Sequence, residues 1–161
     1  YGGQNVGSGR WERLHQGLRA SILLGAGYAV FAFGILYFFA EPLNMLFLDS
    51  GSAALLPLAR QYLMAMALFY FFLALVNIFR LLIQGMGFSP LATLAGVLEL
   101  TGRALISLLV PVMGFNAACY ASPAAWVLAD LFLVPAYLYC FHKLSQPKRR
   151  RFRLLHSSAR G

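Results

Sequence analysis

Four long apolar runs, separated by short polar breaks, dominate the chain. They cover approximately residues 18–40, 54–85, 90–113 and 117–142. The first contains an uncharged stretch from Ala20 to Ala40. Its length matches the roughly 20 residues that an α-helix needs to cross about 30 Å of hydrocarbon. The pattern therefore predicts an all-α integral membrane protein with four transmembrane helices.

Helix-breaking residues lie in the gaps between these runs. Pro42 follows Glu41 and is expected to stop the first helix. Ser52, in an Asp-Ser-Gly-Ser break, is a suitable cap for the second helix. Gly85 and Gly87 predict a tight turn before the third helix, because glycines commonly follow a helix end.

The composition supports a membrane location. Apolar residues make up 60% of the chain and charged residues 11%, whereas soluble domains are about one quarter charged. The formal net charge is +8, but seven of the thirteen Lys and Arg residues lie after residue 142. We interpret residues 146–161 as a basic tail that lies on anionic lipid headgroups, and we expect the lipid bilayer, not a nucleic acid, as the partner.

The distribution of arginines predicts an orientation. Arg10, Arg13 and Arg19 precede the first run, Arg80 closes the second, and the basic tail follows the fourth. The positive-inside rule then places both termini in the cytoplasm. We expect a multi-pass protein of the inner (plasma) membrane.

Signals for catalysis, metals and cofactors are missing from the sequence. His15, His142 and His156 have no companion ligands at the spacing of a metal site. The glycine-rich segment at residues 2–9 follows no strand and does not end in Lys-Ser/Thr, so we reject phosphate binding. No nucleophile, base and orienting acid can be assembled. The sequence predicts neither an enzyme nor a resident cofactor or metal.

Three ionisable residues fall well inside the third and fourth runs, namely Glu99, Arg103 and Asp130. An unpaired charge near the bilayer centre costs about 2.5 to 3.5 kcal/mol on insertion scales, so these residues need partners. Glu99 and Arg103 are four residues apart and can pair on one helix face. Counting from Pro90 and His142 at about 1.5 Å per residue predicts that Arg103 and Asp130 lie at one depth.

This ionisable group allows two interpretations. It can be a salt-bridge network that locks the third and fourth helices together. Alternatively, one of its carboxylates lines a cavity and takes part in proton or cation exchange. Under the second hypothesis, Glu99→Gln abolishes ion-driven efflux and leaves the protein level intact; under the first, the variant fails to accumulate.

Two further groups are candidates for contact with a substrate. Asn77, Arg80 and Gln84 form a polar stripe at helical spacing near the end of the second run. They can either bond to the following turn and to headgroups, or line a gate or vestibule. Tyr70 can stack on an aromatic cation or pack against neighbouring helices, as can the aromatic residues near it, Tyr62, Phe69 and Phe72.

Several segments resemble one family, the multidrug and toxic compound extrusion (MATE) transporters. They are GGQNVGSGR at residues 2–10, LLIQGMGFSP at 81–90, ELTGRA at 99–104 and ASPAAW at 121–126. Each motif alone is weak, but their order and the number of runs between them are similar to those of the second lobe of bacterial members. The resemblance covers residues 1–145.

The resemblance implies that this chain is the C-terminal part of a twelve-helix transporter, with helices nine to twelve present and its N-terminal helices missing. Such transporters have two six-helix lobes and export small organic cations or drugs in exchange for Na+ or H+. In one respect the sequence departs from the family. Some sodium-coupled members carry a carboxylate in the tenth helix, whereas residues 61–79 contain no Asp or Glu.

Two other functions remain open on the sequence. A lipid-linked polysaccharide flippase of the same superfamily would have a similar architecture, with a wide basic cavity. A non-transporting four-helix module would act in membrane assembly and would need a start codon just before Tyr1.

Overall fold

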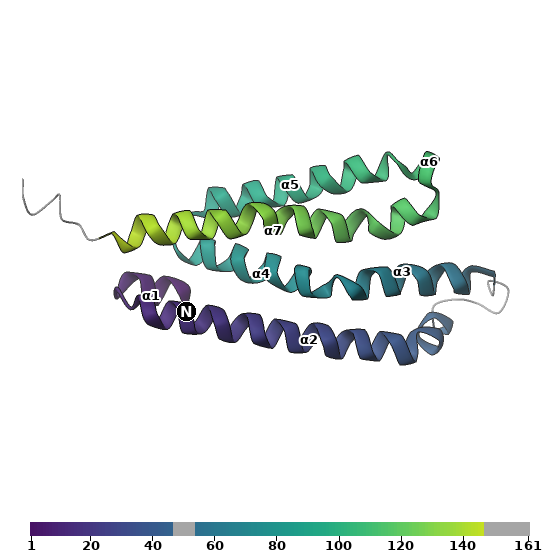
Figure 1. Ribbon diagram of the computed structural model, residues 1–161, viewed down its shortest axis with the longest axis horizontal. Helices are drawn as coiled ribbons and strands as arrows, with labels where there is room; N and C mark the ends of the chain where they lie inside the picture. Colours follow the sequence, from purple (N-terminus) through teal and green to yellow (C-terminus); the bar gives the residue numbers. More distant parts are fainter. Residues whose placement is uncertain (47–53, 147–161) are drawn as a thin grey trace, which may run out of the picture.

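The computed structural model describes residues 1–46 and 54–146, and these form seven helices (Figure 1). The predicted cap at Ser52 and nearly all of the basic tail lie outside the described residues. The helices are α1 (Gly2–Gly7), α2 (Trp11–Met45), α3 (Leu56–Leu68), α4 (Tyr70–Gly85), α5 (Ser89–Ser107), α6 (Val110–Met113) and α7 (Phe115–Ser145).

Each of the four apolar runs is helical, but two of them are interrupted. The second run is broken at Phe69 into α3 and α4, which are bent by 47° relative to each other. The third run is broken after Ser107, and Pro111 lies in the short α6 that follows. The predicted stop at Pro42 is wrong, because α2 continues through it to Met45. A proline in the last turn removes only one backbone donor from the helix, so the helix can continue.

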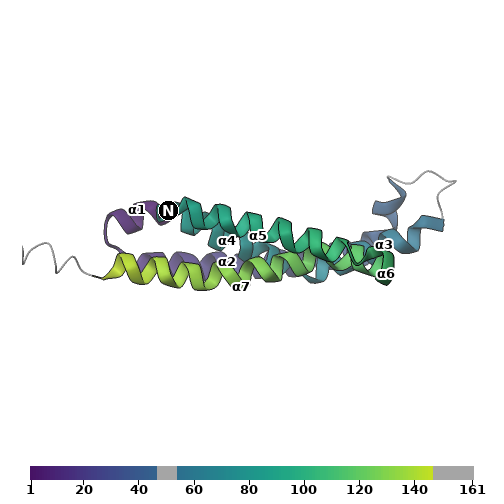
Figure 2. The ribbon, with the colours of Figure 1, turned by 90° about the horizontal axis from the view of Figure 1, so that it is seen from above.

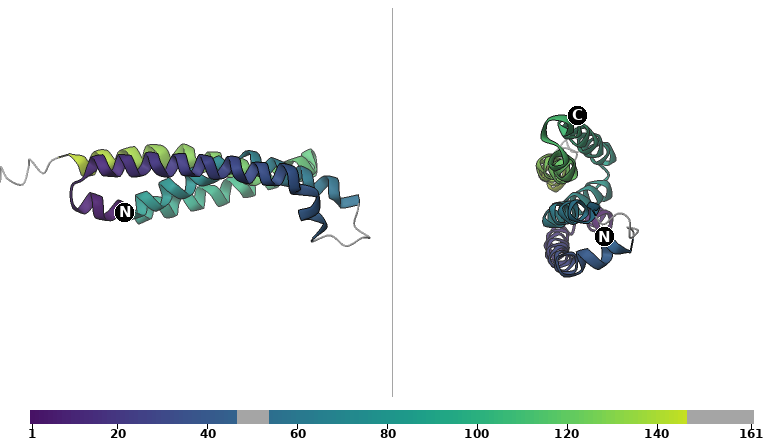
Figure 3. Two further views of the ribbon diagram at one scale, coloured as in Figure 1. Left: turned by 90° about the horizontal axis from the view of Figure 1, so that it is seen from below. Right: turned by 90° about the vertical axis from the view of Figure 1, so that its right-hand side faces the viewer.

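The helices form an elongated, layered bundle. Viewed along its long axis, α2 lies at one side and the α5/α7 pair at the other, with α3 and α4 between them (Figure 3). The strongest packing is between α5 and α7, followed by α4 against α7. Seen from above, α5 and α7 run side by side along most of the bundle (Figure 2).

Small residues bring α5 and α7 close together. Ala92, Ala95 and Gly102 on α5 are buried, and a Cβ placed on Gly102 would lie 3.7 Å from the Cα of Ala125. Gly102 and Ala125 therefore mark the same level of two antiparallel helices. Small side chains of this kind allow the backbones of membrane helices to approach closely.

Glycines also bring α1 against the end of α4. A Cβ on Gly3 would lie 2.8 Å from the carbonyl oxygen of Gly85, and a Cβ on Gly2 would lie 2.8 Å from Leu82 Cδ1. Any larger residue at position 3 would push α1 away from the backbone of α4. The first helix is therefore held against the bundle by close backbone contact.

The described residues contain two helices that are long and apolar enough to cross a membrane, α2 and α7, or three if α3 and α4 together make one span. The third expected span is not among them. Its main helix α5 is long enough at 19 residues, but Glu99 and Arg103 make it less apolar. Much of the surface of α2 is apolar and exposed, as at Leu24 and Phe38. The described residues thus form an all-helical bundle whose long apolar helices suit a membrane.

Candidate functional site

Glu99 is held by two arginines in the interior of the bundle. Arg80 Nη2 on α4 donates to Glu99 Oε2 at 2.7 Å, and Arg103 Nη2 on α5 donates to Glu99 Oε1 at 2.9 Å. The Glu99 side chain is only 15% exposed. Both carboxylate oxygens are thus engaged by charge-assisted hydrogen bonds, which are roughly twice as strong as neutral ones. We call these three residues, Arg80, Glu99 and Arg103, the ion-pair cluster.

The pair between Glu99 and Arg103 follows from their spacing, but the role of Arg80 does not. The sequence places Arg80 at the end of an uncharged run, where a long side chain normally extends to the headgroups. Instead, its guanidinium reaches Glu99 on the next helix, 19 residues along the chain. The sequence contained one signal for this contact. The tight turn at residues 85–88 makes α4 and α5 neighbours, so that cationic and anionic residues on them can meet.

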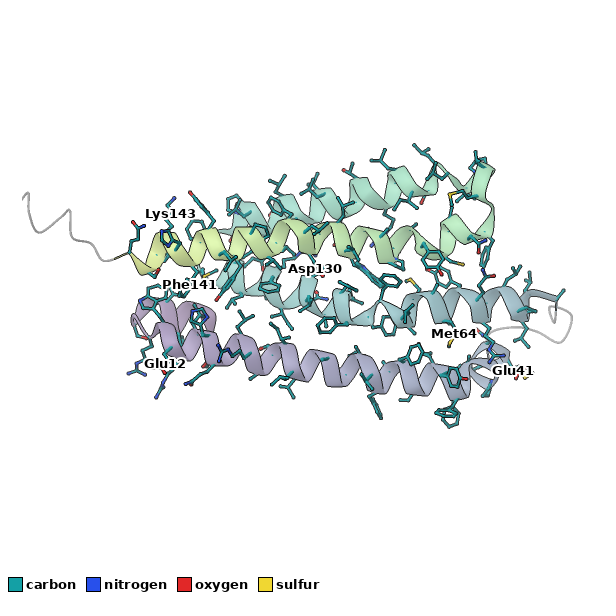
Figure 4. All side chains as sticks on the ribbon, in the orientation of Figure 1. Glu12, Glu41, Met64, Asp130, Phe141 and Lys143 are labelled. Atoms are coloured by element: carbon teal, nitrogen blue, oxygen red, sulfur yellow. The ribbon has the colours of Figure 1, made fainter. Side chains whose placement is uncertain are left out.

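Asp130 lies near the middle of α7 and is buried, with 7% of its surface exposed (Figure 4). Neither of its carboxylate oxygens has a hydrogen-bond partner among residues 1–46 and 54–146. The expected three-membered network of Glu99, Arg103 and Asp130 is therefore not formed in the described structure.

The prediction that Arg103 and Asp130 share one level is wrong. Asp130 is five residues beyond Ala125, about 7.5 Å toward the Ser145 end of α7. Glu99 is displaced from Gly102 in the same direction by about 4.5 Å, whereas Arg103 is displaced the opposite way. Asp130 thus lies nearer the level of Glu99. The error arose because the count assumed that Pro90 and His142 are level, whereas α7 extends past the start of α5.

The polar stripe on α4 does not act as a unit. Asn77 is exposed and donates from Nδ2 to the carbonyl of Leu73 in its own helix at 2.8 Å. Gln84 is exposed near the end of α4. Arg80 alone turns into the bundle. The structure therefore separates Arg80 from Asn77 and Gln84, and a vestibule formed by all three stays a prediction.

Tyr70 lies just after the break between α3 and α4 and packs on α7. Its ring centroid is 6.4 Å from that of Trp126, and neighbouring Phe69 meets Tyr120 at the same separation. These contacts fill the space between α4 and α7 with aromatic side chains. Contact of Tyr70 with a substrate stays a prediction.

A second polar region lies at the opposite end of the bundle and was not predicted from the sequence. A cavity of about 410 Å³ between α2 and α3 is lined by Glu41, Arg60, Gln61 and Met64, together with Leu56 and Pro57 (Figure 4). Gln61 Nε2 also donates to Asn116 Oδ1 on α7 at 2.6 Å. The sequence signal for this polar region was a pair of opposite charges, Glu41 and Arg60, near the ends of two neighbouring apolar runs.

The two free cysteines, Cys119 and Cys140, are both buried on α7. They lie 21 residues apart on one helix, or about 31 Å along its axis, and so cannot form a disulfide with each other. Cys140 packs within the hydrophobic core. Neither thiol belongs to the candidate site.

Comparison with known proteins identifies the family. The chain matches the family model MatE over residues 1–101 of its 161. The matched region includes Arg80 and Glu99, while Arg103 and Asp130 lie beyond it. No curated protein and no solved structure matched the chain. Because the match covers more than half of the sequence, the chain belongs to the MatE family, whose members are transporters.

Proposed function

We propose that this chain forms part of the second lobe of a twelve-helix antiporter, which exports organic cations or drugs in exchange for Na+ or H+. The family match supports transport in general. The remaining helices would come from other residues of the same protein, and the substrate would be a small organic cation. The transporter would require no resident cofactor.

In this proposal the chain crosses the membrane four times. The spans are α2, the bent pair α3 and α4, the pair α5 and α6, and α7. The 19 residues of α5 extend about 28 Å, close to the thickness of the hydrocarbon core. The charges of α5 are tolerable there because Glu99 and Arg103 neutralise each other, and Glu99 also forms a short ion pair with Arg80 of α4.

The proposed orientation has both ends of the chain in the cytoplasm of a plasma membrane. Arg10, Arg13 and Arg19 lie before or in the first turns of α2, and Lys143 lies in the last turn of α7. Lys143 Nζ lies 5.5 Å from the centre of the Phe88 ring, which follows α4. The cationic ends of α2 and α7 and the turn after α4 would thus share the cytoplasmic side.

One observation carries the proposal of ion-coupled export. A buried carboxyl group, Asp130, lies near the level of Glu99 in a membrane bundle and has no hydrogen-bond partner among the described residues. Ionisable groups inside membrane proteins typically mark ion or proton pathways. An antiporter needs a group of this kind, because a gradient can drive export only through an ion that binds differently in the two states.

The test is transport by the complete protein in proteoliposomes. A fluorescent organic cation such as ethidium is placed on one side, and a pH or Na+ gradient is imposed. We expect either the pH gradient or the Na+ gradient to drive accumulation of ethidium against its own concentration gradient. Collapse of the driving ion gradient with an ionophore should stop this accumulation. No gradient-driven movement of several organic cations would contradict the proposal. Movement of a lipid-linked oligosaccharide in the same vesicles would favour the flippase instead.

A further inference from the structure

We propose that Asp130 is a proton-binding carboxyl group, which carries a proton in the arrangement of helices seen here and releases it during the transport cycle. Its part in transport rests on the proposed function, whereas its protonation does not. The proposal starts from burial. Asp130 is 93% buried, and neither oxygen accepts a hydrogen bond from any residue in the described part of the chain. An ionised carboxylate in such a place is costly, and binding a proton removes its charge.

The charged groups nearest to the level of Asp130 are already paired with one another. On α5, Glu99 lies about 3 Å from that level along the helix axis, and its negative charge would oppose a second negative charge beside it. The guanidinium groups of Arg80 on α4 and Arg103 on α5 are both bound to Glu99. On α7 itself, Tyr137 lies two turns away, and its buried hydroxyl also has no partner among the described residues.

The other helices that pack on α7 bring no charge to this level. On α2, Trp11 and His15 contact Phe141, which lies eleven residues, or about 16 Å, beyond Asp130 along α7. On α3, Arg60 and Tyr62 lie in the first two turns, near the opposite end of the bundle. The short α6 has the sequence VPVM and contains no ionisable side chain. Among the helices packed on α7, Glu99 with its two bound arginines is therefore the charged group nearest to the level of Asp130.

A proton fits this position better than a metal cation does. A metal cation takes several oxygen ligands, whereas a proton needs one carboxylate oxygen. Both oxygens of Glu99, the nearest second carboxylate, are already engaged by arginines. A cation bound at Asp130 would therefore have a single carboxylate ligand, near a cluster in which two arginines and one glutamate carry a net charge of +1. The geometry points to H+ as the ion that this carboxyl group exchanges.

Release of the proton to water would leave a buried carboxylate that needs a partner. Arg80 and Arg103 can supply one, because the Nε atom of each is buried and has no acceptor in the described structure. An arginine that turned from Glu99 toward Asp130 would replace a contact between α4 and α5, or within α5, with a contact to α7. Proton release would in this way favour a different packing of these helices.

Infrared difference spectroscopy on the complete purified protein tests the proposal without relying on transport. Spectra recorded at acid and alkaline pH should show the C=O band of a protonated carboxylic acid that is lost at alkaline pH. Asp130→Asn should remove this band. Asp130→Glu should shift it, which assigns the band even if the asparagine variant does not accumulate. Glu99→Asp serves as the control and should leave the frequency of the Asp130 C=O band unchanged.

Two outcomes would overturn the proposal: a spectrum in which the position 130 variants neither remove nor shift a carboxyl band, or a band that Na+ abolishes at constant pH. The second result would mean that Asp130 binds a metal cation. Transport is measured in parallel. A band assigned to Asp130 in a protein that moves no organic cation would contradict the proposed function alone, and transport without the band would contradict this inference alone.

Discussion

Arg80 on α4 and Glu99 on α5 form an ion pair at 2.7 Å, across the turn that joins the two helices. Arg103 bonds to the other oxygen of the same carboxylate. Glu99 is therefore the one acceptor that both arginines share. Its removal would leave two guanidinium groups without a countercharge inside the bundle.

We expect Glu99→Gln to destabilise the protein by about 1.5–3 kcal/mol, the range for hydrogen bonds to charged groups. The fuller loss of about 3–5 kcal/mol seen for buried pairs is not expected, because the arginine side chains are partly exposed. Thermal unfolding of purified protein in detergent measures this change. A variant that unfolds like the wild type and loses only efflux would show instead that the carboxylate serves transport and not packing.

The two arginines should contribute unequally. The Arg80 side chain is 26% exposed and links two helices, whereas Arg103 is 40% exposed and pairs within one helix. We expect Arg80→Gln to cost about 1.5–3 kcal/mol and Arg103→Gln about 0.3–0.5 kcal/mol, as for an exposed pair in a helix. Arg60→Gln, at an exposed position on α3, is the control. Equal losses for Arg80→Gln and Arg103→Gln would contradict this assignment.

These contacts show what the sequence can and cannot predict here. The apolar runs located the helices, because crossing a membrane requires length and hydrophobicity that are visible in one dimension. The spacing of Glu99 and Arg103 predicted their pair, since four residues bring side chains to one helix face. The contact of Arg80 with Glu99 depends on how two helices turn toward each other. No spacing within one helix contains that information.

The break at Phe69 and the level of Asp130 were missed for a similar reason. No Gly or Pro lies at the break between α3 and α4, so local chemistry gave no signal of the 47° bend. The level of Asp130 is set by where Gly102 meets Ala125. Small residues allow helices to pack closely, but their positions in the sequence do not identify which residues face each other.

The contact of α1 with α4 predicts a sharp difference between two glycines of the same short helix. Gly3→Ala would place a Cβ 2.8 Å from the Gly85 carbonyl oxygen, whereas a Cβ on Gly7 would meet nothing within 4 Å. We expect Gly3→Ala to cost about 1–3 kcal/mol through overpacking and Gly7→Ala to be neutral or slightly stabilising. Limited proteolysis near residue 10 reports detachment of α1. Equal protection of both variants would mean that α1 does not pack as described.

Asp130→Asn should leave stability within about 0.5 kcal/mol of the wild type, in contrast to Glu99→Gln. The substitution keeps the shape of the side chain, and it breaks no ion pair or hydrogen bond that the described residues make. Thermal unfolding of the two variants under identical conditions gives the comparison. A loss at Asp130→Asn as large as that at Glu99→Gln would show that Asp130 is held by a partner and belongs to the structural lock.

The close approach of α5 and α7 can be captured as a disulfide. A Cβ on Gly102 would lie 3.9 Å from the Cβ of Ala125, within the 3.5–4.5 Å range usual for disulfide-bonded cysteines. Cysteines introduced by Gly102→Cys and Ala125→Cys, in a background where Cys119 and Cys140 are changed to Ala, should therefore cross-link on mild oxidation. Thiol titration and mass spectrometry of the peptides measure the bond. The control pairs Gly96→Cys with Ala125→Cys. Position 96 lies about 9 Å from position 102 along α5, so this pair should not cross-link.

The oxidised protein then tests how these helices move. Because α5 and α7 are the most tightly packed pair in the bundle, we expect them to move as one body. Efflux should therefore survive the cross-link, at a rate within about twofold of the reduced protein, since a disulfide constrains only motion between the residues it joins. Rearrangement of the arginines around Asp130 requires only side-chain rotation at this level and remains possible. Complete and reversible loss of efflux on oxidation would show that α5 slides along α7 in each cycle.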